Sequence, residues 1–509
     1  MTTTDVPTTR SGALDPTRRN QTIALVTLLV AVFMDMLDGN LVSVALPSIQ
    51  RDLKASYTAV QWMSAGYVFA FALLLITGGR LGDLFGRKKV FLIGVGGFAA
   101  ASLLCSLSVD PQMLIVSRLF QGAFAGIMVP QVLSIIHVTV PKEKQPGVFA
   151  IYGTVGGLAA TSGPLIGGVL VQLNVVGLDW RPIFLINVPV GLLGLYFGAR
   201  HISESKGPAD TRLDLVGVLL ATVGLLLLLY PLTEGRDLHW PAWCYASMAL
   251  AVPVLALFAW FERRKAAAQG SPLVPPQLFR ARSFVAGQGL QLAIFLFTGA
   301  FFLAWYLFMQ IGLNWTPLHA GLTALAFCLG AFISSALSVT ALVPKFGRAV
   351  LQFGAIVLLA GLGAFLAVVE ARGARIGTWD MAGPLLVIGI GFGAVASPIP
   401  MFALADVRHE DAGSASGLIN TMQQLGLTLG IALVSVVFLT PLGGYANITP
   451  GPRGQAESAA AAAAFASAFK PALIASLAVI ALTFAVSYGL PRRVAGHGPA
   501  AQPEPAAAG

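Results

Sequence analysis

Long apolar stretches recur along the whole sequence, and they constrain its fold more than any other feature. Each is at least about 18 residues long, which is enough for one helix to cross a hydrocarbon layer of about 30 Å. Hydrophobic residues make up 56% of the 509 residues and charged residues only 10%. Because soluble domains carry about 25% charged residues, the sequence predicts a polytopic, all-α protein embedded in a lipid bilayer.

The apolar stretches divide the chain into fourteen predicted spans. They lie near residues 22–46, 57–79, 89–108, 111–137, 147–172, 182–199, 213–232, 243–261, 284–311, 318–342, 350–369, 382–403, 413–440 and 469–490. The first apolar span is too long for a cleavable signal peptide. Polar composition predicts a disordered lead at residues 1–20 and a disordered tail at residues 492–509.

The basic residues predict the orientation of these spans. With the N-terminus in the cytoplasm, 22 Lys and Arg fall on the inner side and 8 on the outer side. This positive-inside bias predicts that both termini are cytoplasmic, in a bacterial inner membrane. It also explains the net charge of +9 without a nucleic-acid partner, which we do not expect.

A short repeat indicates an internal duplication. Phe85-Gly86-Arg87 recurs as Phe346-Gly347-Arg348, in the corresponding loop of the second half. We therefore expect an N-terminal six-helix bundle and a C-terminal one with an inserted helix pair between them, as in other transporters built from repeats. The predicted boundaries are 21–200, 201–282 and 283–491.

Five motifs resemble the major facilitator superfamily, and in particular its fourteen-helix drug:proton antiporters. The stretch Gly79 to Lys89 is similar to the superfamily's loop motif. Three other stretches resemble first-, fifth- and sixth-helix motifs of the antiporter group and comprise residues 37–47, 153–168 and 180–189. The run from Gly413 to Gly426 is similar to the group's thirteenth helix. The resemblance implies the major-facilitator fold and proton-driven export of small molecules without a cofactor.

Two acids are predicted deep within a span, Asp35 and Asp38, which share one helix face at i and i+3. A carboxylate in hydrocarbon is costly unless it meets water, a partner or a proton, so these residues suit a proton site. Arg118 is the only base that we predict in the membrane interior. The resemblance implies that Asp38 carries the proton and that Arg118 tunes it; a purely structural ion pair is the alternative.

The loop motif and the fifth span provide candidates for gating. Asp83 and Arg87 can form a charged contact between helix ends, where Gly79 and Gly86 permit a tight turn. In the fifth span, small residues permit close helix packing and a proline permits a bend. The residues expected to move there are Gly163, Pro164, Gly167 and Gly168.

Polar and aromatic residues in the spans are candidates for substrate binding, although each could equally be an interfacial or packing residue. They are Gln61, Trp62, Tyr67, Trp305, Tyr306, Asn420, Gln423 and Gln424.

The sequence predicts a proton-coupled exporter of drugs or small amphipathic molecules, with a monomer as the expected unit. Export of one endogenous metabolite or lipid-like product is an alternative, and a non-transporting sensor or assembly partner is another. No nucleotide-binding loop and no metal-ligand spacing occurs in the sequence. An enzyme and a metal site are therefore not expected.

Overall fold

The computed structural model describes residues 16–141, 144–173, 177–207, 214–235, 238, 240–268, 272–434, 437–438, 441–442 and 454–492, except for some side chains within helices. Every regular element in this part of the chain is helical. Within it, 13 helical segments are long and apolar enough to cross a membrane. A further 29-residue helix, α5 (Gln145–Leu173), lies between the fourth and the fifth of these segments.

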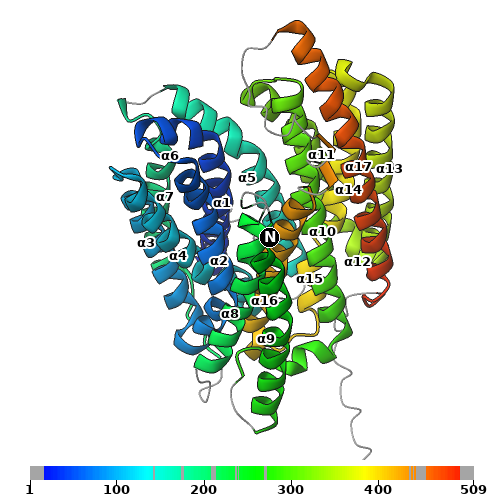
Figure 1. Ribbon diagram of the computed structural model, residues 1–509. Coiled ribbons are helices and arrows are strands. Elements are labelled where there is room, and N and C mark those ends of the chain that lie inside the picture. The colour runs from blue at the N-terminus through cyan, green and yellow to red at the C-terminus, as the bar shows by residue number, and fades with distance from the viewer. Residues whose placement is uncertain are drawn as a thin grey trace, which may run out of the picture.

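The helices form two bundles that stand side by side (Figure 1). The N-terminal bundle contains α1 (Pro16–Asp52), α2 (Tyr57–Phe85), α3 (Arg87–Ser106), α4 (Pro111–Thr139), α5, α6 (Pro182–Leu185) and α7 (Asn187–His201). The C-terminal bundle contains α10 (Arg282–Leu307), α11 (Pro317–Leu337), α12 (Val343–Phe346), α13 (Ala349–Arg372), α14 (Thr378–Ala396), α15 (Ile399–Leu404), α16 (Ala412–Val434) and α17 (Gln455–Ser487). Short 3₁₀ or π segments continue several of these helices.

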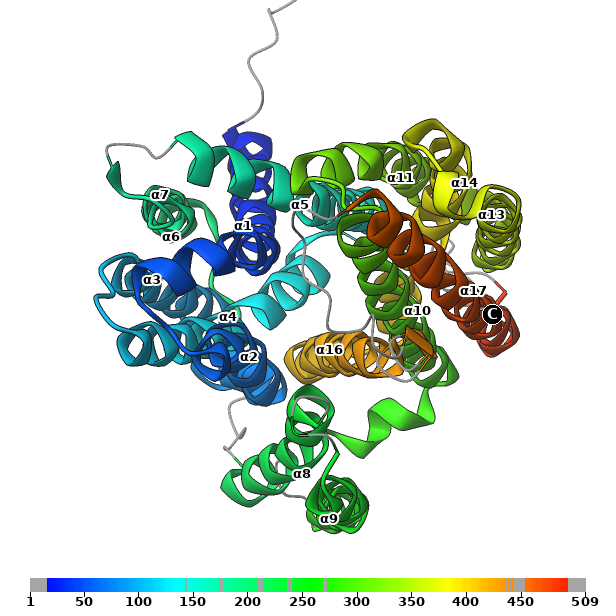
Figure 2. The ribbon, with the colours of Figure 1, turned by 45° about the horizontal axis from the view of Figure 1, so that its top comes forward.

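The inserted pair consists of α8 (Leu215–Glu234) and α9 (Ala242–Ala267). Figure 2 shows both helices outside the two bundles, with α8 beside α2 and α16. The pair therefore touches the seam between the bundles while most of α9 faces outward.

The two bundles repeat the same packing, as expected of an internal duplication. In the first, α1 packs against α5 and α7, and α2 packs against α4. In the second, α10 packs against α16 and α17, and α11 packs against α14. Gly86 and Gly347, the central residues of the repeated tripeptide, both follow a helix and have positive φ values of 105° and 58°. Glycine suits both turns because other residues avoid this region.

The bundles meet along α2–α16 and α5–α11. A Cβ atom on Gly79 would lie 2.1 Å from the carbonyl oxygen of Gly413, and one on Gly417 would lie 2.8 Å from that of Leu75. Glycine therefore lets the two backbones touch. This contact lies where α2 ends and α16 begins. We call this end, which also carries residues 86–89, 263–265 and 345–348, the basic end.

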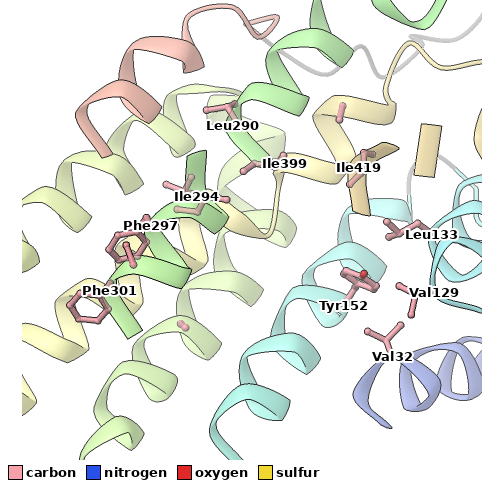
Figure 3. Close-up of a cluster of buried hydrophobic side chains, with 14 of the residues drawn as sticks. Val32, Val129, Leu133, Tyr152, Leu290, Ile294, Phe297, Phe301, Ile399 and Ile419 are labelled. Atoms are coloured by element: carbon pink, nitrogen blue, oxygen red, sulfur yellow. The ribbon is translucent and has the colours of Figure 1, made fainter. Parts of the chain in front are cut away.

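Apolar side chains from both bundles form one core (Figure 3). From the first bundle come Val32, Val129, Leu133 and Tyr152, and from the second come Leu290, Ile294, Phe297, Phe301, Ile399 and Ile419. All are buried. The α5 and α16 residues of this core are therefore part of the packing that joins the halves.

At the opposite end, the Trp180-Arg181 motif ties the chain before α6 to the end of α1. Trp180 Nε1 donates to Asp52 Oδ2 at 2.9 Å, and Arg181 Nη1 lies 2.8 Å from the same oxygen. The hydrogen bond from Trp180 and the charge of Arg181 hold the pKa of Asp52 below its usual range.

Three helix boundaries differ from the predictions. Helix α1 begins at Pro16, so the last five residues of the predicted disordered lead are helical. Helix α2 continues to Phe85, because Gly79 and Gly82 are packing positions rather than turn positions. Helix α17 begins at Gln455, since an alanine-rich run with high helix propensity precedes its apolar part. The remaining lead and the tail from residue 493 lie outside the described residues.

Candidate functional site

The centre of the N-terminal bundle holds a buried ion pair between α1 and α4. Arg118 Nη1 lies 2.5 Å from Asp38 Oδ2, and the two residues are 1% and 0% exposed. The sequence places both groups in apolar spans without showing that they meet. A charge in apolar surroundings requires a partner, and here Arg118 and Asp38 are partners of each other.

Two uncharged amides complete the partners of Asp38, and a serine contacts both of them. Gln121 Nε2 and Asn187 Nδ2 donate to Asp38 Oδ1 at 2.9 and 2.8 Å, and Gln121 Nε2 also lies 2.8 Å from Ser102 Oγ. They come from α4, α7 and α3. Three donors thus point at Asp38, which fits an ionised carboxylate, an acceptor only.

Arg118 has further neutral partners. Its Nε donates to the Met63 carbonyl at 3.0 Å and its Nη1 donates to Gln121 Oε1 at 2.7 Å. Its guanidinium carbon lies 4.2 Å from the centre of the Tyr67 ring, within the range of a cation–π contact.

Asp35 lies one turn before Asp38 in a different environment. Tyr67 Oη donates a hydrogen bond to Asp35 Oδ1. Asp35 is 7% exposed whereas Asp38 is 0% exposed. Tyr67, a predicted substrate residue, therefore joins the two acids by contacting Asp35 with its hydroxyl and Arg118 with its ring.

The structure thus brings Asp35, Asp38 and Arg118 together with Tyr67. The residues that sequence reasoning missed here are Ser102, Gln121 and Asn187. Each is a polar residue within an apolar span, and this is the feature of the sequence that could have identified it as a candidate. Only the fold shows that Gln121 and Asn187 converge on one carboxylate and that Ser102 contacts both of them.

At the basic end, Asp83 and Arg87 form a second buried ion pair. Arg87 Nη2 lies 2.7 Å from Asp83 Oδ1, with both side chains almost fully buried. Asp83 also lies against Gly413 in the first turn of α16, where a Cβ would be 2.5 Å from both of its carboxylate oxygens. A carboxylate is favourable there because the first turn has free N–H groups and a partial positive charge. We call the contacts of Gly79 and Asp83 with Gly413, together with those of Gly417, the gate.

The segment that follows α7 holds the α2–α3 turn. Glu204 accepts from the Lys88 and Lys89 N–H groups, both at 3.1 Å. Gly207 N donates to the Asp83 carbonyl at 2.8 Å. A Cβ on Gly86 would lie 2.6 Å from the Glu204 carboxylate, so this glycine is needed for space as well as for its φ value.

Several charged residues lie at or just beyond the ends of the predicted spans but within long helices of the structure. Arg80 and Asp83 are buried in α2, and Glu262 is buried in α9. Lys470, near the start of the last predicted span, lies inside α17. The placement of Arg118 as the one base in the membrane interior stays a prediction.

The fifth-span residues lie on α5 as predicted. Gly163 is buried, and a Cβ on Gly167 would lie 3.3 Å from Leu41 Cδ2 of α1. The side chain of Pro164 and the surroundings of Gly168 lie outside the described residues. The described glycines therefore place α5 close to α1, and their motion stays a prediction.

Among the N-terminal substrate candidates, Gln61 has no described side chain. Trp62 turns toward the inserted pair, with its ring 6.0 Å from that of Tyr230. It lines a cavity of about 320 Å³ with Phe69, Leu226, Leu227, Tyr230 and Ser247. Trp62 therefore lies between α2 and α8, away from Asp35 and Asp38.

The C-terminal candidates lie on α10 and α16. Trp305 is buried and stacks on Phe301, with ring centres 6.0 Å apart. Tyr306 is half-buried. Asn420 Nδ2 donates to Ser416 O at 2.9 Å, within its own helix, and Gln424 is half-buried.

Gln423 accepts a hydrogen bond from Gln291 Nε2 at 3.3 Å. Gln291 and the nearby Gln288, both on α10, were missed by sequence reasoning. The Oε1 atoms of both and Nε2 of Gln288 are buried without a hydrogen-bond partner in the described part of the chain. Unpaired polar atoms of this kind are available to a ligand or to water.

The helical repeat, the buried ion pairs and the charged contact between bundles define a membrane transporter of two pseudo-symmetric halves. The family model of the Major Facilitator Superfamily matches residues 28–431. The chain belongs to this superfamily.

The relatives are transport and resistance proteins. A Streptomyces coelicolor protein named "Probable actinorhodin transporter" is 37% identical over 86% of this chain and 77% of its own length. The puromycin resistance protein of Streptomyces alboniger is 35% identical over 81% of each chain. The cephamycin export protein of Amycolatopsis lactamdurans is 34% identical over 82% of this chain and 85% of its own.

A solved structure shares the fold. The human organic anion transporter MFSD10 matches with a TM-score of 0.60, covering 93% of this chain and 100% of its own, at 16% identity.

Proposed function

We propose that this protein exports small amphipathic molecules of the drug or antibiotic class from the cytoplasm in exchange for protons. The observation that carries the proposal is the pairing of Asp38 with Arg118 beside the Asp35–Tyr67 contact. Asp35 and Asp38 lie on one helix face, and Arg118 is a permanent cation with other partners. The two acids can therefore bind and release a proton while Arg118 exchanges one partner for another. The names of the relatives support the export of antibiotic-like substrates.

In this mechanism the bundles rock around the site between them. The structure has the bundles in contact at the basic end, through Gly79, Asp83 and Gly413. If the basic end faces the cytoplasm across a bacterial inner membrane, the state with this end closed admits protons from outside. Proton binding to Asp35 or Asp38 changes the partners of Arg118, and the gate then opens inward. The proton leaves to the cytoplasm, and the substrate leaves outward in the return step.

The proton gradient is proposed to be the sole driving force, with no cofactor and a single chain as the unit. Asp35, Asp38 and Arg118 would carry the coupling, and the polar residues around Gln288, Gln291 and Gln423 would contact the substrate. The gate would be formed by the α2–α16 contact.

The test is transport by purified protein in proteoliposomes with an imposed pH gradient. Relatives' substrates, such as puromycin, serve as probes. Accumulation that requires the gradient and vanishes with an ionophore supports the proposal. Equal accumulation without a gradient contradicts it.

The orientation has its own test. Reporters fused after Lys265 and after Arg493 are both expected to read cytoplasmic, since 22 basic residues lie on that side. A periplasmic reading at either position contradicts the fourteen-span topology.

A dedicated exporter of one endogenous product is the second candidate, favoured by the relatives named for actinorhodin and cephamycin. Comparing the metabolites released by deletion and wild-type cells separates it from a broad drug exporter. A sensor that does not transport is disfavoured by the complete ion-pair network, and gradient-driven uptake would exclude it.

A further inference from the structure

Two carboxyl groups of the inserted pair meet at the basic end. Asp214 precedes α8 and accepts from the Gly217 N–H at 2.8 Å. Glu262, near the end of α9, accepts from the Val274 N–H at 2.8 Å. The two carboxyl groups both lie against Gly217, in the first turn of α8. Both residues are buried, with exposures of 1% and 3%.

Among the described residues, each of the two carboxyl groups has one oxygen without a hydrogen-bond donor at the place where the groups meet. Asp214 Oδ2 and Glu262 Oε1 are buried and have no hydrogen-bond donor in the described part of the chain. A Cβ on Gly217 would lie 3.0 Å from the first and 2.4 Å from the second. Ionised carboxylates only accept hydrogen bonds, so two of them cannot bond to each other. One shared proton gives both oxygens a partner.

Lys265 balances the remaining charge. Its ammonium lies 2.8 Å from Asp214 Oδ2 and forms an ion pair with it, although the angles do not allow a hydrogen bond. With one proton on the pair, the three side chains are neutral overall. Without it they carry a net negative charge in a buried place, which is unfavourable.

The same carboxyl pair is connected to the gate. Glu262 fixes the backbone at Val274, and the preceding carbonyl, that of Leu273, accepts from Ser414 Oγ at 3.1 Å. Ser414 follows Gly413 in the first turn of α16. The linker after α9 is therefore attached to the inserted pair on one side and to the gate helix on the other.

Arg80 lies between the acids of the gate and those of the inserted pair. It is buried, and its Nε has no hydrogen-bond partner among the described residues. Among the described residues, Asp83 and Asp214 form ion pairs with Arg87 and Lys265, and neither ion pair includes Arg80. Its charged neighbours are Asp83 of the gate, Asp411 in the 3₁₀ turn before α16, and Glu262 and Asp214 of the inserted pair. A guanidinium without a fixed partner can move toward whichever side is more negative.

We propose that Asp214 and Glu262 form a proton-binding site, separate from Asp35 and Asp38, that holds the inserted helix pair on the gate. With the proton bound, the pair stays closed, Val274 and Leu273 stay in place, and Arg80 remains with the gate acids. Loss of the proton separates the two carboxylates and draws Arg80 from the gate. The closed gate is therefore stable at low pH and opens as pH rises. This proposal goes beyond export and does not depend on its direction.

The experiment measures the gate directly by the distance between spin labels at the basic end. Cysteines replace Arg200 and Phe346, which are exposed on opposite bundles; the native cysteines are buried. The protein carries Asp35→Asn and Asp38→Asn, so that the central acids do not titrate and their bias toward the open gate is the same at every pH. We expect the ratio of closed to open gate to fall with rising pH, by up to about tenfold per pH unit for one proton.

Glu262→Gln tests the site. Glutamine can accept from Val274 with its oxygen and donate to Asp214 with its amide, so it imitates the protonated pair. The gate should then stay closed at all pH values. Asp214→Asn, which keeps the acceptor for Gly217, is the second variant with the same expectation. Glu370→Gln, at an exposed acid, is the control and should keep the pH dependence.

Two results overturn the proposal. One is a gate that shows no pH dependence in the Asp35→Asn/Asp38→Asn protein. The other is a pH dependence that survives Glu262→Gln or Asp214→Asn. The first result needs no variant of the pair, so the proposal remains testable if either substitution prevents folding.

Discussion

Arg118 contacts Asp38 at 2.5 Å inside the N-terminal bundle, and it has three further partners that are neutral. The partners are the Met63 carbonyl, Gln121 Oε1 and the face of the Tyr67 ring. Arginine cannot lose its charge in a protein, so a proton on Asp38 would otherwise leave an uncompensated buried cation. Because Arg118 has these other partners, protonation of Asp38 leaves its buried charge partly compensated.

The first prediction concerns Asp38→Asn. The amide imitates a permanently protonated carboxyl and removes the charge change, so gradient-driven export should fall to background. Binding of a neutral substrate should change by less than about tenfold, since the size and hydrogen-bonding capacity are similar. Efflux and proton release in proteoliposomes, with equilibrium binding alongside, are the measurements.

Asp35→Asn is the matched comparison, one turn away on the same helix. We expect a smaller or substrate-dependent defect. If Asp35→Asn alone abolishes export while Asp38→Asn exports with normal proton stoichiometry, the assignment of Asp38 is wrong. Asp35, which is the more exposed of the two, would then be the principal site.

The second prediction concerns Gln121→Met, which removes a donor to Asp38 Oδ1 without a large change of volume. A carboxylate with fewer donors binds its proton more tightly, so the pH at half-maximal transport should move upward. The variant should also lose about 1–3 kcal/mol of stability. Transport measured across a pH series is the test, with melting in detergent as the second readout. An unchanged pH profile would assign Gln121 a structural role only.

The sequence was sufficient to predict the class, the duplication and the acids of the first helix. Hydrophobic length and a tripeptide repeat carry that information locally. It was not sufficient for Gln121 and Asn187, because two residues on different helices are brought to one carboxylate only by packing. The same holds for Trp62, whose direction depends on where α8 lies.

The charged residues near helix ends show a second limit. Asp83 and Glu262 follow long apolar runs, and hydropathy ended the spans before them. In the structure the helices continue, because the carboxylates have partners in Arg87 and Val274. A hydropathy profile has no access to such partners.

The third prediction concerns Gly79→Ala. The added methyl group would lie 2.1 Å from the Gly413 carbonyl, and backbone on both sides leaves little room to yield. The closed basic end should therefore be disfavoured by at least about 1.4 kcal/mol, a tenfold change in population. Gly363→Ala, where no atom lies within 4 Å, is the control and should behave as wild type. Label distances across the basic end are the measurement; an unaltered distribution would exclude a steric role for Gly79.

The fourth prediction concerns Asp83→Asn. The variant should reach the membrane in near-normal amounts but transport several-fold more slowly, because it loses both the ion pair with Arg87 and the charge at the start of α16. Turnover in proteoliposomes, normalised to the amount of protein, is the readout. Normal turnover would remove Asp83 from the mechanism.

The fifth prediction concerns pH and the contact of Asp52 with Trp180 and Arg181 at the opposite end. These donors lower the pKa of Asp52, so the folded protein binds its proton less readily than the unfolded chain does. A lowered pKa stabilises the fold above the unfolded value of about 3.9 and ceases to do so as pH falls through the folded value. Asp52→Asn should therefore melt below wild type at neutral pH, and the difference should vanish in acid. The side chain is 36% exposed, so solvent screening limits the effect to about 1 kcal/mol or less. Melting temperatures in detergent from neutral to acid pH measure it, with Glu370→Gln as the exposed-acid control. A difference that persists unchanged in acid would mean that the Asp52 contact stabilises the fold by packing rather than by charge.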